Sequence, residues 1–70
     1  MLSSDYPKHF IEELYNAEYE KMFRFAYHIL NNTESAKDMV QETFLLALFH
    51  QEDLIAHPKP EGWLMLTLRN

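Results

Sequence analysis

Apolar residues recur at helical spacing along most of this chain, and the pattern predicts helices rather than strands. Pro7 follows Asp5 closely and suits the first turn of a helix that Asp5 would cap. A first helix is therefore expected over about residues 6–30. Its buried stripe is predicted to contain the apolar residues Phe10, Leu14, Met22, Phe23, Ala26, Ile29 and Leu30.

The polar residues Asn31, Asn32 and Thr33 separate this helix from the next one. Asn tolerates the left-handed conformation that ends many helices, and Asn32 or Thr33 can cap a following helix. A second helix is expected over about residues 34–50. Its core face follows helical spacing and is predicted to contain Ala36, Met39, Val40, Thr43, Phe44 and Ala47.

The second predicted helix also has a face of mixed character. A solvated face would not normally place Leu45, Leu46 and Phe49 outward beside charged residues. A wide buried stripe explains these residues equally well on periodicity alone, because apolar stripes of ~100° or more are ordinary in globular helices. The pattern leaves open whether the mixed face is buried or binds a partner; it contains Asp38, Gln41, Glu42, Leu45 and Phe49.

The rest of the chain predicts a connection and a third helix. Residues 51–61 are expected to form the connection, because Pro58 and Pro60 exclude regular helix around them. The third helix is expected over about residues 61–70, with Trp63 as a core anchor. Residues 1–70 would then form a single all-α domain, a compact bundle of three helices. The abrupt end after Arg69 and Asn70 suggests a truncated longer protein.

Composition narrows the class of protein. The chain is 47% apolar, with nine Phe and Tyr residues and one Trp, which is too much apolar material for a disordered chain. The absence of Cys favours a reducing compartment, and a cytoplasmic location is expected. No signal peptide or run of ~18 apolar residues is visible, so no membrane partner is expected.

The charge balance bears on the partners. A net charge of −5 argues against a free-standing nucleic-acid binder, which usually carries a basic excess. A domain whose main partner is a basic protein surface, with DNA as a second partner, is compatible with this balance.

Catalytic and metal-binding constellations are not evident in the sequence. The chain has a single Gly and therefore no Gly-rich phosphate loop, and it has no Cys nucleophile. His9 lies near Glu12, and His50 lies near Asp53, but each pair is expected to be exposed and isolated. Helical metal sites instead combine Glu and His ligands that point inward from several helices. We expect no enzymatic activity, no cofactor and no bound metal.

Four segments in a fixed order resemble region 2 of the bacterial sigma factors, most closely the small extracytoplasmic-function group. The resemblance spans Leu14 to Asn70. Each segment is weak evidence by itself, whereas the four together in this order and spacing are specific. They are the Leu-Tyr…Met-Phe-Arg-Phe-Ala-Tyr-His-Ile-Leu pattern, the Asn31-Asn32 turn, the run Ala36-x-Asp38-x-Val40-Gln41-Glu42-x-Phe44, and Pro60-x-Gly62-Trp63-Leu64 closing with Arg69-Asn70.

The resemblance implies that the second helix docks on the clamp coiled coil of the RNA polymerase beta-prime subunit. Asp38, Gln41 and Glu42 would then face basic and polar groups, and Leu45 and Phe49 would add apolar contacts. Carboxylates accept charge-assisted hydrogen bonds from Arg, and apolar neighbours exclude water from such bonds. The alternative is that Asp38 only interacts with the helix dipole, while Gln41 and Glu42 are merely solvated.

The resemblance also implies that the loop and third helix capture the non-template strand of the minus-ten promoter element. Unstacked bases are usually held by stacking and backbone contacts. Candidate DNA-binding residues at the matching positions are His57, Lys59, Trp63, Leu66, Arg69 and Asn70.

Three departures from the family pattern keep a second interpretation open. Leu66 stands where the family commonly has Arg or Lys, and Leu46 and Phe49 stand where polar or basic residues are frequent. These changes remove cations and add apolar surface, which weakens the DNA-binding interpretation more than the docking one. The second interpretation is a protein–protein module of the same fold, either a homodimer or an anti-sigma binder, that lacks DNA function.

Overall fold

The computed structural model describes residues 9–70, and the predicted Asp5 cap and helix start near residue 6 lie outside this range. No strand occurs among the described residues, so the all-α fold class is confirmed. The helices within residues 9–70 are α1 (Phe10–Leu30), α2 (Thr33–Phe49), α3 (Gln51–Ala56) and α4 (Pro60–Arg69).

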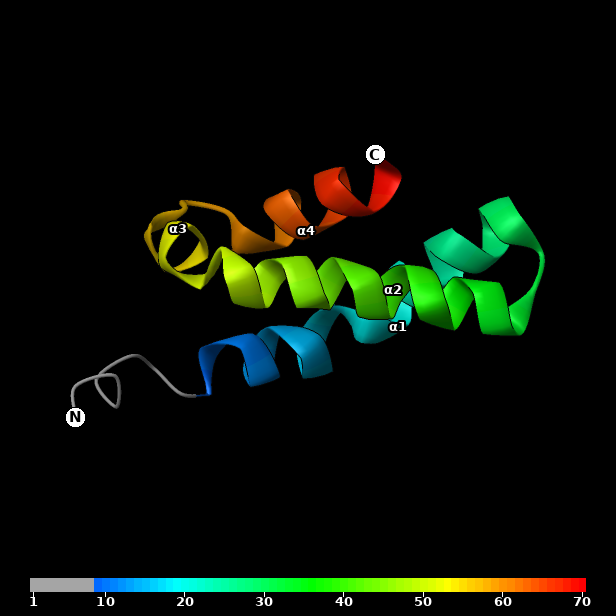
Figure 1. Ribbon diagram of the computed structural model, residues 1–70, viewed down its shortest axis with the longest axis horizontal. Helices are drawn as coiled ribbons and strands as arrows, with labels where there is room; N and C mark the ends of the chain where they lie inside the picture. The colour runs from blue at the N-terminus through cyan, green and yellow to red at the C-terminus, as the bar shows by residue number, and fades with distance from the viewer. Residues whose placement is uncertain (1–8) are drawn as a thin grey trace.

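The central element of the bundle is α2. It runs antiparallel to α1, and α4 packs against both of these helices (Figure 1). The short α3 lies at the end of α2 and contacts both α2 and α4. The described chain is elongated, with extents of 43 × 21 × 18 Å, because the turn end of the α1–α2 hairpin projects beyond α4.

The turn between α1 and α2 has the geometry that its residue types predict. Asn31 adopts the left-handed conformation with φ 53° and ψ 37°, and its N–H donates to the Tyr27 carbonyl at 2.6 Å. The side chain of Asn32 caps α2, because its Oδ1 accepts from the Ser35 backbone N–H at 2.8 Å. The hairpin therefore reverses within two Asn residues, and α2 begins at Thr33.

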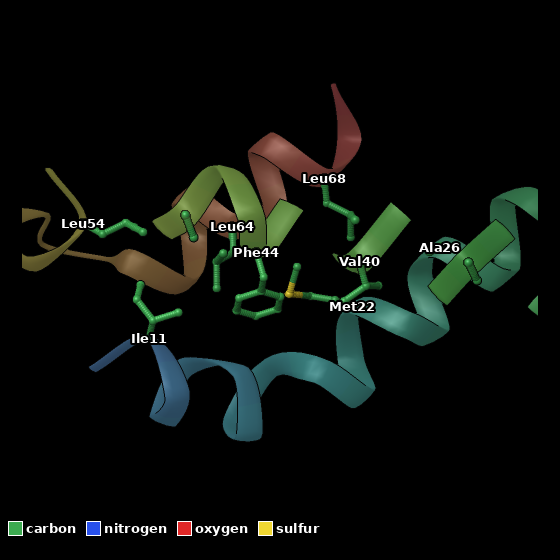
Figure 2. Packing of buried hydrophobic residues seen from close by; sticks show 10 residues of the cluster. Ile11, Met22, Ala26, Val40, Phe44, Leu54, Leu64 and Leu68 are labelled. Atoms are coloured by element: carbon green, nitrogen blue, oxygen red, sulfur yellow. The ribbon is translucent and has the colours of Figure 1, made fainter. Parts of the chain in front are cut away.

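Every described helix contributes to one apolar core (Figure 2). Met22 and Val40 are fully buried between α1 and α2, and Phe44 lies close to both in the same layer. Thr43, the one buried polar side chain within residues 9–70, donates from Oγ1 to the Met39 carbonyl at 2.9 Å, so its hydroxyl is satisfied. Buried apolar residues are Ile11, Met22, Ala26, Ala36, Val40, Phe44, Ala47, Leu54, Leu64 and Leu68.

The core face predicted for α2 is confirmed, with Met39 half-buried, whereas the α1 stripe is partly wrong. Ile29 and Leu30 are 52% and 41% exposed, and Ile11, which was not predicted, is buried. Ile29 and Leu30 are the last two residues of α1, at the turn end of the hairpin, and this end projects beyond α4 in Figure 1. Helical spacing places them on an apolar side of α1, but no further helix of the described chain covers that end.

Residues 51–56 form a helix where the sequence predicted a connection. The segment is six residues long, which is too short for a convincing apolar period. It is held by the complete burial of Leu54 against α2 and α4. The predicted break is confirmed further on, because His57 is extended before Pro58. Pro60 takes the first position of α4, one residue before the predicted start.

Candidate functional site

The mixed face of α2 lies entirely on the surface of the described chain. Asp38, Glu42, Leu45 and Phe49 follow the spacing i, i+4, i+7 and i+11, which keeps them on one side of the helix. All four side chains are exposed, as is Gln41 at the edge of the same face. The structure thus brings together on one surface all five residues that the sequence predicted for polymerase docking.

The exposure of the apolar residues answers the question that periodicity left open. Phe49 is 83% exposed, and Leu45, Leu46 and Leu48 are also exposed. The interpretation as a wide buried stripe is therefore wrong for the described chain. Apolar side chains of this size, placed on the surface beside Asp38 and Glu42, are typical of a surface that binds a partner.

Gln41 links the mixed face of α2 to α1. Its side-chain Nε2 donates to the hydroxyl oxygen of Tyr15 at 2.9 Å, across a separation of 26 residues in the sequence. The Tyr15 ring also packs on Phe44, with ring centroids 4.9 Å apart, and on Tyr19 at 5.1 Å. The position of the Tyr15 hydroxyl is therefore fixed by packing, and it orients the Gln41 amide so that Oε1 can accept from a partner.

A pocket of about 600 Å³ lies beside this hydrogen bond, between the first turns of α1 and the second half of α2. Its wall is largely apolar, and Gln41 and Leu45 belong both to this wall and to the mixed face. The pocket is lined by His9, Ile11, Glu12, Tyr15, Gln41, Phe44, Leu45 and Leu48.

An exposed ion pair marks the α1 side of the pocket. His9 Nδ1 and Glu12 Oε1 are 3.0 Å apart. The hydrogen bond to the Glu12 carboxylate, and then its charge, raise the pKa of His9 above the ordinary value of about 6.5. The rim of the pocket therefore combines the Glu12 carboxylate with a His that is easily protonated.

The candidate DNA-binding residues begin in the segment that connects α3 to α4. His57 and Lys59 are exposed, and the Lys59 backbone N–H donates to His57 Nδ1 at 2.9 Å. This hydrogen bond holds the His57 ring against the backbone of the turn before Pro60. The Lys59 side chain extends from the residue immediately before α4.

The remaining candidates for DNA contact lie on α4 and at its end. Leu66 and Arg69 are exposed on the side of the helix opposite the buried Leu64 and Leu68, and Asn70 is the exposed C-cap. Trp63 is half-buried and packs against the core, as the sequence predicted.

Trp63 also has a ring neighbour near the end of α2. Its centroid lies 6.0 Å from that of the His50 ring, at an interplanar angle of 54°. Packing against both the core and His50 leaves only part of the indole open to a partner.

Sequence reasoning missed the pocket beside the mixed face. Tyr15, Ile11 and Leu48 were not named as site residues, because nothing local distinguishes them from ordinary apolar positions. A Tyr hydroxyl that bonds a Gln 26 residues away can be recognised only after the two helices are packed. The one available signal was that Leu45 and Leu48 lie one turn apart and add apolar residues to a helix that already has a complete core face.

Residues 9–70 contain neither a cluster of metal ligands nor a helix that could span a membrane. That part of the chain contains no cluster of three or more His, Asp or Glu side chains placed to hold a metal ion. Its helices also lack the length and hydropathy that crossing a bilayer requires.

Comparison with known proteins gives one result that covers most of the chain. The family model for Sigma-70 region 2 matches residues 14–70, which includes nearly all of α1 and the whole of α2, α3 and α4. Comparisons with curated proteins and with solved structures found no significant match. A match of this extent, on a helical bundle with an exposed acidic and apolar α2 face, establishes the family: the chain belongs to the sigma-70 family as a region 2 domain, which acts in transcription initiation.

Proposed function

We propose that this domain docks on the clamp coiled coil of the RNA polymerase beta-prime subunit through the mixed face of α2. The observation that carries the proposal is the joint exposure of Asp38, Gln41, Glu42, Leu45 and Phe49 on the side of α2 opposite the core. The family match supports a partnership with polymerase core and promoter DNA in general, and the geometry supports this particular face.

The chemistry of the face suits a basic helical partner. Asp38 and Glu42 lie one turn apart and accept charge-assisted hydrogen bonds from Arg or Lys side chains. Leu45 and Phe49 continue the same line by two further turns and remove water from around these bonds. The acids lie at one end of this line on α2 and the apolar side chains lie at the other. The face therefore specifies both the charge of the partner and the direction in which the partner runs.

We further propose that the segment from His57 to Asn70 contacts the non-template strand of the minus-ten element. Lys59 and Arg69 supply the positive charge for phosphates, and both are exposed. His57 and Asn70 can bind bases or phosphates, and the open part of Trp63 offers a limited stacking surface. Leu66, at 59% exposure, gives the same surface an apolar contact in place of a cation.

The docking proposal is tested by titrating the 70-residue chain against the isolated clamp coiled coil. The double variant Gln41→Ala, Glu42→Ala is expected to bind about tenfold more weakly or worse, because it removes one charge-assisted and one neutral hydrogen bond. Isothermal titration calorimetry measures the dissociation constant, and circular dichroism checks that the variant remains helical.

Glu20→Ala is the matched control, because it removes the same charge from an exposed position on α1 outside the proposed surface. It is expected to leave the dissociation constant nearly unchanged. Equal affinity for the double variant and the unaltered chain would contradict the docking proposal, as would failure of the folded chain to bind at all.

A second candidate function rests on the apolar departures from the family pattern. Leu46, Phe49 and Leu66 are all exposed and supply the surface that a homodimer or an anti-sigma factor would use. Under this alternative the chain self-associates or binds an anti-sigma factor, and it does not bind the coiled coil.

Membership of the small extracytoplasmic-function subgroup and origin in a longer protein stay predictions from the sequence.

A further inference from the structure

The pocket between α1 and α2 is a feature that the docking proposal does not use. Its volume of about 600 Å³ exceeds the ~150 Å³ cavity left by removing one large aliphatic side chain, so it has room for more than one apolar group. The wall includes Ile11, Phe44 and Leu48, which present apolar carbon from both helices.

The pocket adjoins the mixed face of α2, and this position indicates which partner it binds. Gln41 and Leu45 form part of its wall and part of the mixed face, so a helix that crosses the face reaches the pocket mouth without a gap. Amphipathic helices commonly bind by placing apolar side chains one turn apart into such a groove. Two side chains at i and i+3 or i+4 match the volume that is available.

The charges around the pocket indicate the chemistry of that helix. Glu12 lines the pocket from α1, where it pairs with His9. On α2, Asp38 and Glu42 lie one turn before the lining residues Gln41 and Leu45. A helix that places basic residues next to its apolar pair would meet carboxylates on both sides of the groove. A second copy of this chain would instead bring acids against acids, because each copy carries a net charge of −5.

We infer that the docking surface extends from α2 onto α1 through this pocket, and that the pocket takes two apolar side chains, one turn apart, from the basic partner helix. The inference rests on the proposed function, because the partner is the same coiled coil. The hydrogen bond between Gln41 and Tyr15 joins α2 to α1 within the wall of the pocket.

The test compares two Leu residues that lie two positions apart on α2 and therefore point to different sides of it. Leu48 lines the pocket and is 50% exposed, while Leu46 does not line it and is 45% exposed. Leu48→Trp fills the pocket with a larger apolar side chain, and Leu48→Lys places a positive charge in it. Leu46→Trp and Leu46→Lys make the same chemical changes outside the groove. Each chain is titrated against the isolated clamp coiled coil, and circular dichroism checks its fold.

Both Leu48 variants are expected to bind at least about tenfold more weakly than the matching Leu46 variants, with equal helicity. Equal affinities for the Leu46 and Leu48 variants would overturn the inference, and the docking proposal would stand if Gln41→Ala, Glu42→Ala still weakened binding. Binding that is weakened neither by the Leu48 variants nor by Gln41→Ala, Glu42→Ala, or a folded chain that does not bind at all, would overturn both the inference and the docking proposal. Self-association that Leu48→Trp abolishes without changing coiled-coil affinity would assign the groove to a second copy and also overturn the inference.

Discussion

Asn31 is the residue at which the α1–α2 hairpin changes direction. It is the only non-Gly residue with positive φ in the described part of the chain. Its N–H closes the last turn of α1 on the Tyr27 carbonyl, and Asn32 starts α2 through a side-chain cap. Two neighbouring residues of the same type therefore end one helix and begin the next by different physical means, Asn31 through its backbone and Asn32 through its side chain.

Substitutions of Asn31 should distinguish the cost of its left-handed backbone conformation from any stabilisation by its side chain. Asn31→Ala is expected to lower the free energy of unfolding by about 1 kcal/mol, because a Cβ without a local polar group makes the left-handed conformation costly. Asn31→Gly is the matched control and should leave stability unchanged or slightly higher, because Gly adopts positive φ freely. Urea denaturation followed by circular dichroism measures both values, and a destabilised Gly variant would show that the Asn31 side chain matters instead.

At the scale of the element, α3 is the helix that depends most on tertiary packing. Six residues seldom hold a helix by themselves, because helix initiation is unfavourable in a short segment. Leu54 is fully buried against the neighbouring helices, so packing rather than local propensity maintains α3. The helix also sets where His57 and Lys59 lie, since they follow it directly and lead into α4.

The contribution of α3 can be measured with two neighbouring truncations. Leu54→Ala should lower the free energy of unfolding by about 2–5 kcal/mol, because it removes a buried side chain and leaves a cavity. Ile55→Ala is the matched control on the exposed side of α3 and should change stability by about 0.5 kcal/mol or less. Urea titrations compare the two. Equal losses of unfolding free energy for Leu54→Ala and Ile55→Ala would mean that α3 does not pack as described.

At the scale of the whole molecule, the acidic surface lies apart from the two cations that we propose contact DNA. The chain carries a net charge of −5, and its proposed docking face is acidic. Lys59 and Arg69, the proposed phosphate contacts, lie at the two ends of α4. A molecule with this charge balance is expected to bind a promoter strand only when it is docked on the polymerase.

This expectation leads to a comparison of the chain alone with its polymerase complex. A fluorescent single-stranded oligonucleotide carrying a minus-ten sequence should bind the complex with core polymerase but not the chain alone at the same salt concentration. Arg69→Ala should weaken binding by the complex about two- to tenfold, because it removes a phosphate contact. Lys37→Ala, on exposed α2 surface, is the control and should have little effect. Fluorescence anisotropy provides the measurement, and equal losses for both variants would contradict a DNA role for Arg69.

The sequence by itself determined the features that depend on local geometry. The period of apolar residues predicted α1, α2, α4 and the core face of α2, and the residue types at Asn31 and Asn32 predicted the turn. The spacing of Asp38, Gln41 and Glu42 placed them on one face, and the order of short motifs identified the family. These properties follow from a helical repeat and from backbone preferences, which act over a few neighbouring residues.

Only the tertiary structure decided which apolar residues are covered. Ile29 and Ile11 lie on the same side of α1, yet Ile29 is exposed because α4 does not reach the turn end of the hairpin. The burial of Leu54, the Gln41–Tyr15 bond and the pocket beside it also depend on contacts between segments distant in sequence. A helical period fixes the direction in which a side chain points, whereas burial and pocket shape depend on what the rest of the chain places opposite it.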